Sequence, residues 1–405
     1  MRQSVALCIG AGVAALAIYY AYRKSQKRKI LVVGSINVDL YQRTQGGAVT
    51  FAKKSVSVQP IKGMTLPASS FVANPKVNTG KVAEGAEEAF VLTMDGPFEQ
   101  KTGGKGANAA AAAAQTFACD FLGNMGEASA AENEALLRDL ARFGKVGTEY
   151  ISVLPGKPTG TAYILLFDDN DNAILLLGGA NQAWPGQAEL MAPGGRLHKA
   201  VSGAAAVMLQ REVPEYVNVA TARLARSLGT PVLMDVGGTD SPLDPNLLPH
   251  VSLIAPNESE LTFISGVATQ DPATGAVKGA LVRKAVRALR DKFGAAGNPA
   301  VEVLVTLGAL GSLHFAPDGT ETHVGCFALQ TPDGKPRDTC GAGDCYRGSY
   351  VGARYGEGRT VEDSMRWAAA AAACSVEVEG AMPSMPPRSA IAARYAQPMA
   401  RTDAL

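Results

Sequence analysis

The strongest constraint on the fold is an alternation of short apolar segments with longer helical ones in the second half of the chain. Strands are predicted at 205–210, 231–236, 251–255 and 301–307, and helices at 215–228, from about 258, and at 282–293. Such alternation predicts a parallel sheet with helices on both faces. Ligands bind these sheets beyond the carboxyl ends of the strands. We therefore expect the chemistry in the segments that follow Val33, Leu209, Val236, Ala255 and Leu307.

The first half of the chain adds a buried strand, a hairpin and a long irregular segment. Residues 29–34 read as an apolar strand that ends at a glycine, and 161–167 with 172–177 as a hairpin. The alanine runs 109–114 and 368–373 predict tightly packed helices, because alanine is the best helix former. Residues 41–100 lack clear periodicity. Since long unstructured loops are uncommon in compact domains, we expect edge strands and an insertion there.

Composition excludes several classes of protein. The chain has 38 Lys and Arg against 37 Asp and Glu, so its net charge of +1 offers no global attraction for nucleic acid. A hydrophobic content of 47 % with 19 % charged residues excludes bulk disorder. The six cysteines form no CxxC pair and the four histidines are scattered. We therefore expect neither a disulfide scaffold nor a zinc site, and a reducing compartment.

The N-terminal residues 1–29 predict a single transmembrane anchor. Residues 4–22 carry no charge, and a basic juxtamembrane segment follows at 23–29. The excess of positive charge after the apolar run places the rest of the chain on the cytosolic side. The alternative is a buried helix of the globular domain, in which case the protein would be cytoplasmic. A cleaved signal peptide would carry its positive charge before the apolar run.

The segment Asp338-Thr-Cys-Gly-Ala-Gly-Asp344 predicts an anion pocket. Gly341 and Gly343 allow a sharp turn that points several N–H groups at one spot, and a following helix adds its partial positive charge. Asp344 lies at the rim, where a carboxylate can take a proton from an attacking hydroxyl. The plainer interpretation is an acidic residue favoured at a helix N-terminus by the dipole alone.

Two further segments carry polar groups suited to a polyhydroxyl ligand. Asn37 and Asp39 alternate along an extended chain and therefore face the same way. In Gly103-Gly-Lys-Gly-Ala-Asn108 the glycines admit a small ligand to the backbone, and Lys105 and Asn108 can donate hydrogen bonds. A dinucleotide fingerprint from Gly104 would need a preceding strand, and residues 95–102 read as a poor one. An ordinary polar strand end and a plain loop before a helix are the bland alternatives.

Two loops after later strands are candidates for the nucleotide side. Asn257 can cap a helix, and Glu260 can instead hold Mg²⁺ through water near phosphates. In the segment 306–311, glycines follow a strand and can admit a nucleotide. No GxxxxGK[ST] motif occurs, which excludes a P-loop NTPase.

Taken in order, these segments resemble the ribokinase family of carbohydrate kinases. The Gly-Ala-Gly-Asp signature, Gly-Ser-Ile-Asn-Val-Asp at 34–39 and Gly-Gly-Lys-Gly-Ala-Asn at 103–108 support the resemblance, which runs from residue 30 to about 388. It implies a three-layer α/β/α sandwich with a small β-sheet lid, forming one kinase domain at 30–395 with the lid and its insertion at 41–100. It also implies ATP-dependent phosphorylation of D-ribose at its 5-hydroxyl.

The resemblance implies a role for each matching position. It makes Asp344 the catalytic base and the backbone of Gly341, Ala342 and Gly343 the anion hole. Sugar contacts fall on Asn37, Asp39, Gly104, Lys105, Asn108 and Glu212. Asn257 and Glu260 match a motif linked to Mg²⁺ and phosphate, and Thr306, Gly308 and Gly311 fall at the nucleotide loop. A monovalent cation, usually K⁺, is implied at Asp338, Cys340, Ser375, Val378, Gly380 and Ser384.

Departures from the family pattern leave alternatives open. Asp235 and Arg347 stand where asparagines are typical, and the first places a negative charge near the nucleotide phosphates. The lid normally mediates dimerisation, and the insertion falls there, so a homodimer is one possibility and the oligomeric state is open. The competing functions are a kinase of the same family for another sugar or a nucleoside, and a membrane-tethered sugar-binding protein with weak catalysis.

Overall fold

The computed structural model describes residues 28–43, 65–67, 99–127, 130–144, 146–166, 172–239 and 241–399. Within them the main sheet has nine strands in the order β14-β13-β12-β11-β10-β9-β1-β5-β6. Every neighbouring pair from β12 to β6 is parallel, as predicted. The strands are β1 (Lys29–Val33), β5 (Cys119–Gly126), β6 (Val146–Leu154), β9 (Ala204–Leu209), β10 (Val232–Met234), β11 (Leu253–Ile254), β12 (Glu302–Thr306), β13 (Ser312–Phe315) and β14 (Glu321–Val324).

The edge strands β13 and β14 are the exception to the predicted parallel sheet. β12 pairs antiparallel with β13, and β13 pairs antiparallel with β14. The connections between these strands are only a few residues long, and a short connection can join only antiparallel neighbours. The strand–helix alternation therefore predicted the parallel part of the sheet and not this hairpin edge.

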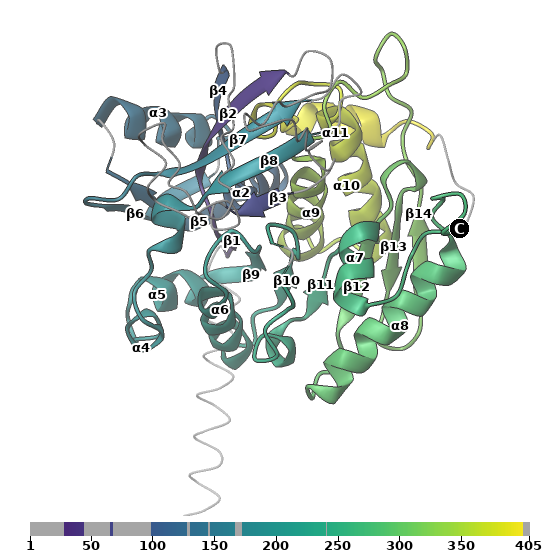
Figure 1. The fold of residues 1–405 in the computed structure, drawn as a ribbon, viewed down its shortest axis with the longest axis horizontal. Helices are drawn as coiled ribbons and strands as arrows, with labels where there is room; N and C mark the ends of the chain where they lie inside the picture. The colour runs from purple at the N-terminus through teal and green to yellow at the C-terminus, as the bar shows by residue number, and fades with distance from the viewer. Residues whose placement is uncertain are drawn as a thin grey trace, which may run out of the picture.

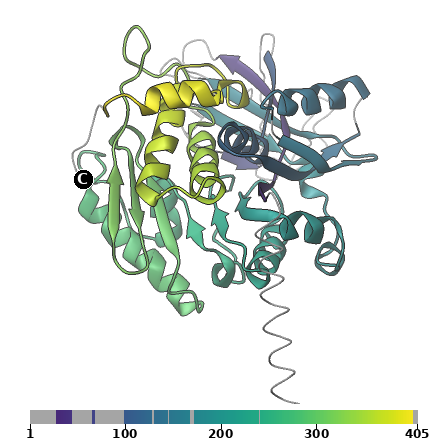
Figure 2. The same cartoon turned by 180° about the vertical axis from the view of Figure 1, so that it is seen from behind.

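Helices cover both faces of the main sheet, which gives the predicted three layers. Side chains of β1 alternate between the two cores: Ile30 and Val32 pack with α2, α9, α10 and α11, whereas Leu31 and Val33 pack with α5, α6, α7 and α8. The opposite views of Figure 1 and Figure 2 show these two helical layers. The first layer comprises α2 (Lys105–Thr116), α9 (Ala342–Val351), α10 (Val361–Ser375) and α11 (Arg388–Tyr395), and the second α5 (Arg196–Ser202), α6 (Glu215–Ser227), α7 (Glu258–Ser265) and α8 (Gly279–Ala295).

A second, five-stranded sheet forms the lid, in the order β3-β8-β7-β2-β4. β7 and β8 form the predicted hairpin, and β3 and β4 are edge strands, as expected for the 41–100 region. The expectation that residues 95–102 make a poor strand is wrong for the second half of that segment, because residues 99–102 belong to β4, which pairs antiparallel with β2. The strands are β2 (Asn37–Arg43), β3 (Thr65–Pro67), β4 (Glu99–Gly103), β7 (Gly160–Leu166) and β8 (Asn172–Leu177).

The remaining described elements are short or peripheral. They are α3 (Ala130–Ala141), α4 (Gln187–Leu190), a π-helical turn (Gly352–Gly356) and the 3₁₀ turns Gly179–Gln182, Leu248–His250, Gly308–Leu310 and Met382–Ser384. Residues 1–27 of the predicted anchor segment 1–29 and most of the 41–100 insertion lie outside the described residues, and Lys29 begins β1. Among the residues that are described, no helix has the length and apolar character needed to cross a bilayer.

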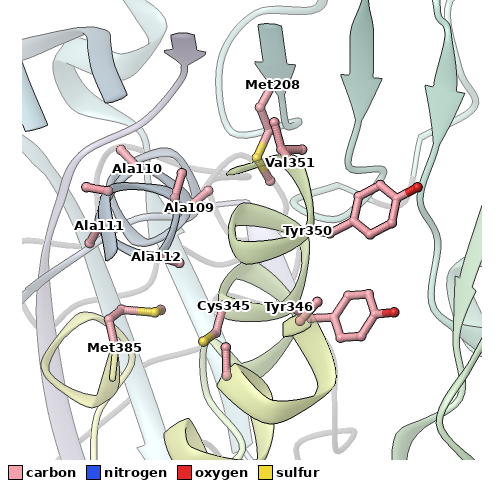
Figure 3. Packing of buried hydrophobic residues seen from close by; sticks show 14 of the residues in the cluster. Ala109, Ala110, Ala111, Ala112, Met208, Cys345, Tyr346, Tyr350, Val351 and Met385 are labelled. Carbon is pink, nitrogen blue, oxygen red and sulfur yellow. The ribbon is translucent and has the colours of Figure 1, made fainter. Parts of the chain in front are cut away.

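The two alanine-rich helices are buried, and α2 packs closely against α9. Figure 3 shows Ala109–Ala112 of α2 beside α9, whose Tyr346 and Tyr350 rings point away from α2. Gly348 of α9 makes this approach possible, because a Cβ at that position would lie 2.5 Å from the carbonyl oxygen of Ala109 and 2.9 Å from Cβ of Ala112. The small side chains thus bring the N-termini of two helices to the same edge of the sheet.

Candidate active site

A cavity of about 270 Å³ lies where the carboxyl ends of the parallel strands meet the lid. This is the edge at which the sequence predicts the chemistry. Many of the predicted site residues line it, namely Asn37, Asp39, Gly104, Lys105, Asn108, Glu212, Asn257, Glu260, Cys340, Gly341, Gly343 and Asp344. The two lid residues Ala162 and Ile164 complete the wall on the side of β7.

Asp344 occupies the first turn of α9, directly after the glycine turn. Gly341 is the N-cap residue and has a φ of 74°, a conformation that favours glycine. The Asp344 side chain is buried, and its Oδ1 accepts a hydrogen bond from Lys105 Nζ at 2.7 Å. Its Oδ2 accepts a second bond from Asn108 Nδ2 at 3.0 Å. Two residues predicted to contact a sugar therefore hold the predicted base in the ligand-free protein.

The N-termini of α2 and α9 both open onto the cavity. Gly104 caps α2 with a φ of 92°, and Gly341 caps α9. Neither cap glycine makes a side-chain cap bond. At α2 the first N–H groups already have acceptors, because that of Lys105 donates to Glu212 Oε2 and those of Gly106 and Ala107 donate to Ser35. At α9 the N–H groups of Gly343 and Asp344 have no acceptor among the described residues, and the partial positive charge of this helix end favours an anionic group in the cavity.

Asp39 and Asn108 present buried oxygen atoms that find no protein partner. Asp39 is 3 % exposed, and its Oδ1 has no hydrogen-bond partner among the described residues; the same is true of Oδ1 of Asn108. Burial raises the pKa of Asp39 well above its usual range, with Glu212 and Asp344 adding to the effect. A buried acceptor without a partner is unfavourable, so both atoms are placed to meet the hydroxyl groups of a ligand.

One contact with a glycine and one with an asparagine fix the side chains of Asp39 and Asn37 in place. Gly103 leaves room for Asp39, because a Cβ there would lie 1.7 Å from Asp39 Oδ2. Asn181 donates from Nδ2 to Asn37 Oδ1 at 2.7 Å and brackets the backbone of Ile36. Within the described part of the chain the side-chain nitrogen Nδ2 of Asn37 has no acceptor, so it can donate to a ligand. Asn181 was not predicted from sequence, because its role depends on a contact 144 residues away.

Glu212 bonds mainly to the protein frame of the cavity. Its Oε2 accepts from Ser35 Oγ at 2.6 Å and from the backbone N–H of Lys105 at 3.0 Å. Burial raises the pKa of Glu212, and the bond from Ser35 and the nearby Lys105 oppose that rise. Glu212 therefore ties the ends of β1 and β9 to the start of α2, and it also lines the cavity.

The sequence suggested two roles for Asn257 and Glu260, a helix cap and a position beside the ligand, and the structure shows a helix cap that also lies at the cavity. Asn257 Oδ1 accepts from the backbone N–H of Glu260 at 2.7 Å, and Glu260 Oε2 accepts from the backbone N–H of Asn257 at 2.8 Å, a capping box at the start of α7. Both residues also line the cavity. The cap thus fixes the carboxylate of Glu260 at the wall of the site.

Asp235 and Arg347 belong to the site, although the sequence marked them only as departures from the family pattern. Asp235 Oδ2 lies 3.1 Å from Lys105 Nζ and 3.2 Å from Arg347 NH1. Arg347 NH2 lies 3.1 Å from Glu260 Oε2. Burial alone would lower the pKa of Lys105, but Asp235 and Asp344 raise it, so Lys105 is charged. The prediction that ligands bind after Val236 could have pointed to this group, since Asp235 and the cavity residue Gly237 flank Val236.

Other predicted residues lie outside the cavity wall. Thr306 ends β12, Gly308 and Gly311 flank the 3₁₀ turn that follows, and Ala342 begins α9; none lines the described cavity. Asp338 accepts from the backbone N–H groups of Cys340 and Gly380, both at 2.8 Å, and so joins two loops named for a monovalent cation. Of the remaining residues in that set, Ser375 and Ser384 are buried and Val378 is 47 % exposed.

The fold and the site together define a class of enzyme. The site combines a buried carboxylate, two helix N-termini and unpartnered hydrogen-bonding groups under a β-sheet lid. It can therefore bind a hydroxyl compound and an anionic group at one place. These are the requirements for transferring a phosphoryl group to a sugar hydroxyl.

Comparison with known proteins places the chain in a family. Residues 90–388 match the pfkB family of carbohydrate kinases. The chain belongs to this family, which includes the ribokinases, and is a sugar kinase. A ribokinase of Arabidopsis thaliana is 35 % identical over 292 residues, covering 71 % of this chain and 70 % of the relative. A deoxyribokinase of Salmonella typhi is 29 % identical and covers 73 % and 88 %.

Solved structures confirm the ribokinase-like fold. The structure of Arabidopsis thaliana ribokinase complexed with ribose and ATP superposes with a TM-score of 0.68 at 29 % identity. The match covers 92 % of this chain and 99 % of that one.

Proposed function

We propose that this protein transfers the γ-phosphoryl group of ATP to the 5-hydroxyl of D-ribose, giving D-ribose 5-phosphate and ADP. The observation that supports it most directly is the pair of buried, unpartnered oxygens on Asp39 and Asn108 beside Asp344. A ligand rich in hydroxyl groups is the chemical complement of such atoms. The relative that has been solved with ribose and ATP shares the fold over nearly the whole described chain.

In this proposal the described side chains divide the work of the reaction. The sugar hydroxyl oxygen forms a bond to the γ-phosphorus as the bond from that phosphorus to the β,γ-bridging oxygen breaks, and ADP leaves. Asp344 accepts the hydroxyl proton, and the backbone N–H groups at 341–343 stabilise the developing charge. Lys105, which lies 2.7 Å from Asp344 in the free protein, supplies a positive charge at the same point.

The residues proposed for Mg²⁺ fit a hydrated ion. Among the described contacts, both bonds to the Glu260 carboxylate are made to Oε2, so Oε1 is available to hold a water of hydrated Mg²⁺. When bound, Mg²⁺ would neutralise part of the charge on the donor phosphates.

The monovalent cation remains part of the proposal. The Asp338 carboxylate holds the backbone at 340 and 380 together, which is the arrangement needed for a site built mainly from backbone carbonyls. Such an ion would stabilise the loop that leads into the anion hole.

The test is ADP release by the full-length chain, measured with a coupled assay. We expect turnover with D-ribose, faster in the presence of K⁺, and with 5-phosphorylation shown by NMR of the product. The panel includes 2-deoxy-D-ribose, D-fructose and adenosine, because a deoxyribokinase is among the relatives. Preferential turnover of another sugar would replace ribose as the substrate, and sugar binding without ADP release would favour the weakly catalytic alternative.

A further inference from the structure

A row of buried charges of alternating sign crosses one side of the cavity. It runs from Asp344 to Lys105, Asp235, Arg347 and Glu260, with nitrogen–oxygen distances of 2.7, 3.1, 3.2 and 3.1 Å. Each cation in this row is shared between two carboxylates. A change at Lys105, Asp235 or Arg347 therefore alters the charge balance of a neighbour on each side.

Asp235 is the central acceptor of this row and is fully engaged. Its Oδ1 accepts from the backbone N–H of Gly237 at 2.9 Å, and its Oδ2 faces both Lys105 Nζ and Arg347 NH1. Burial alone would raise the pKa of Asp235, but Arg347 and Lys105 lower it below its usual range. The carboxylate is therefore ionised, although only 1 % of the residue is exposed.

Arg347 lies directly beneath the anion hole. It is one helical turn after Gly343, and a Cβ on Gly343 would lie 2.8 Å from Arg347 NH1. Its Nε donates to the carbonyl oxygen of Ala255 at 2.8 Å, which fixes the guanidinium at the end of β11. A permanent positive charge is thus held against the backbone that would receive the phosphoryl group, with Asp235 as its counter-charge.

We propose that Asp235 and Arg347 act as one positioning unit that sets the affinity of the site for the nucleotide phosphates. The inference rests on the proposed ATP-dependent function. The carboxylate cancels the charge of the guanidinium, so the two residues together present no net charge to the phosphates. Removing the Arg347 guanidinium would leave a net negative charge beside the phosphates, and removing the Asp235 carboxylate would leave a net positive charge there.

The test is a double-mutant cycle on nucleotide affinity. The probe is the β,γ-imido analogue of ATP with Mg²⁺, titrated calorimetrically into the full-length chain without sugar. We expect Arg347→Asn to weaken binding by about tenfold or more, because Asp235 is left uncompensated. We expect Asp235→Asn to tighten it, and the double variant D235N/R347N to return to within about threefold of the original affinity. Single effects of the same sign, or a double variant that binds as weakly as Arg347→Asn, would overturn the proposal.

A matched variant separates this role from a structural one. Arg394 and Glu377 form another buried pair at 3.0 Å, outside the cavity. Glu377→Gln should lower the thermal midpoint and leave nucleotide affinity unchanged. If Arg347→Asn behaved like Glu377→Gln, the unit would be structural only and the proposal wrong.

Failure of the proposed function would look different. If the original protein binds the analogue but does not phosphorylate ribose, the substrate assignment falls and the cycle still decides the role of the pair. If the original protein does not bind the analogue, both proposals fall.

Discussion

At the scale of single residues, the site is organised around the Asp344 carboxylate. Lys105 and Asn108 donate to its two oxygens, while Asp39 presents an unpartnered oxygen into the same cavity. Among the described residues the site therefore contains both satisfied and unsatisfied polar groups, and substitutions at the two kinds of position should have different consequences.

Asp344→Asn should remove the proton acceptor while preserving the shape of the site. We expect kcat to fall by at least about 10² with a modest change in KM, because a positioned base contributes about 10²–10⁴ to the rate. Steady-state kinetics with ribose and ATP measure this. Near-normal turnover in the variant would show that another group accepts the proton.

Asp39→Asn should stabilise the ligand-free protein at neutral and alkaline pH. The folded state holds the Asp39 proton more tightly than the unfolded chain, because burial raises the pKa. This contribution to stability is fully present below the ordinary carboxyl pKa of about 4 and is lost as the pH rises through the higher folded value. We expect the variant to melt about 2 °C or more above the original protein at pH 8, with a difference that shrinks on acidification.

The same substitution should weaken sugar binding. The amide of Asn keeps one acceptor oxygen but replaces the other with an NH₂ donor, so one sugar hydroxyl loses its acceptor, and we expect KM for ribose to rise by about tenfold. Thermal melts from pH 5 to 8, without and with ribose, measure both effects. A lower melting temperature at pH 8 would show that the buried carboxylate is paired in solution.

Sequence patterns predicted the individual site residues better than their mutual contacts. The glycine turn predicted Asp344, and the spacing of Asn37 and Asp39 predicted a shared face. The bond from Lys105 to Asp344 spans 239 residues, and no local pattern encodes it. Asp235 and Arg347 looked unfavourable one at a time, and only the fold shows that their charges meet.

At the scale of elements, the position of the site depends on how closely α2 and α9 approach. Their contact is made by alanines and Gly348, and it places Asn108 within hydrogen-bond distance of Asp344. Alanine propensity predicted both helices. The sequence did not show that they pack against each other, because that contact joins segments far apart in the chain.

Gly348→Ala should push these helices apart. The new Cβ would lie 2.5 Å from a backbone oxygen that cannot move alone, and such overpacking costs about 1–3 kcal/mol. We expect a lower thermal midpoint and a loss of kcat of about tenfold or more, because misplacing reacting groups by about 1 Å can cost 10². Differential scanning fluorimetry and kinetics measure the two.

Gly294→Ala is the matched control in α8, where a Cβ would meet no atom within 4 Å. It should leave kcat unchanged and stabilise the protein by about 0.5–1 kcal/mol. Equal behaviour of the two variants would mean that the α2–α9 contact is looser than the structure shows.

Strands and helices of the parallel sheet followed from their sequence patterns, and the lid strands followed only in part. β4 escaped prediction because Glu99–Gly103 lacks apolar residues and is held by pairing with β2. Whether such a polar segment forms a strand depends on the strand with which it pairs, and the local sequence does not show that partner.

At the scale of the whole molecule, a central sheet supports Asp344 and the proposed nucleotide side of the cavity, and a smaller sheet covers the proposed sugar side. The five-stranded lid contributes Asn37, Asp39, Ala162 and Ile164 to the cavity wall, while the N-terminus of α9 contributes Asp344. Residues 1–27, which precede these two sheets, lie outside the described residues, so the transmembrane anchor stays a prediction.

The predicted anchor can be tested with the full chain. A fluorescent protein fused to the C-terminus should follow cellular membranes, and removing residues 1–27 should release it, because a long uncharged apolar run followed by basic residues favours insertion. A matched fusion with two arginines placed within 4–22 should also be released. A freely diffusing full-length fusion would count against the anchor.

Because the pocket unites Asn37 with Asp344, its two halves leave the ribosome at very different times. A nascent chain that has emerged only as far as α8 already contains the lid strands and the cavity-lining α2, but it contains no proton acceptor and no anion hole. If Asp344 is the proton acceptor, premature termination between α8 and α9 would therefore yield polypeptides that retain Asn37, Asp39 and Asn108 and cannot transfer a phosphoryl group.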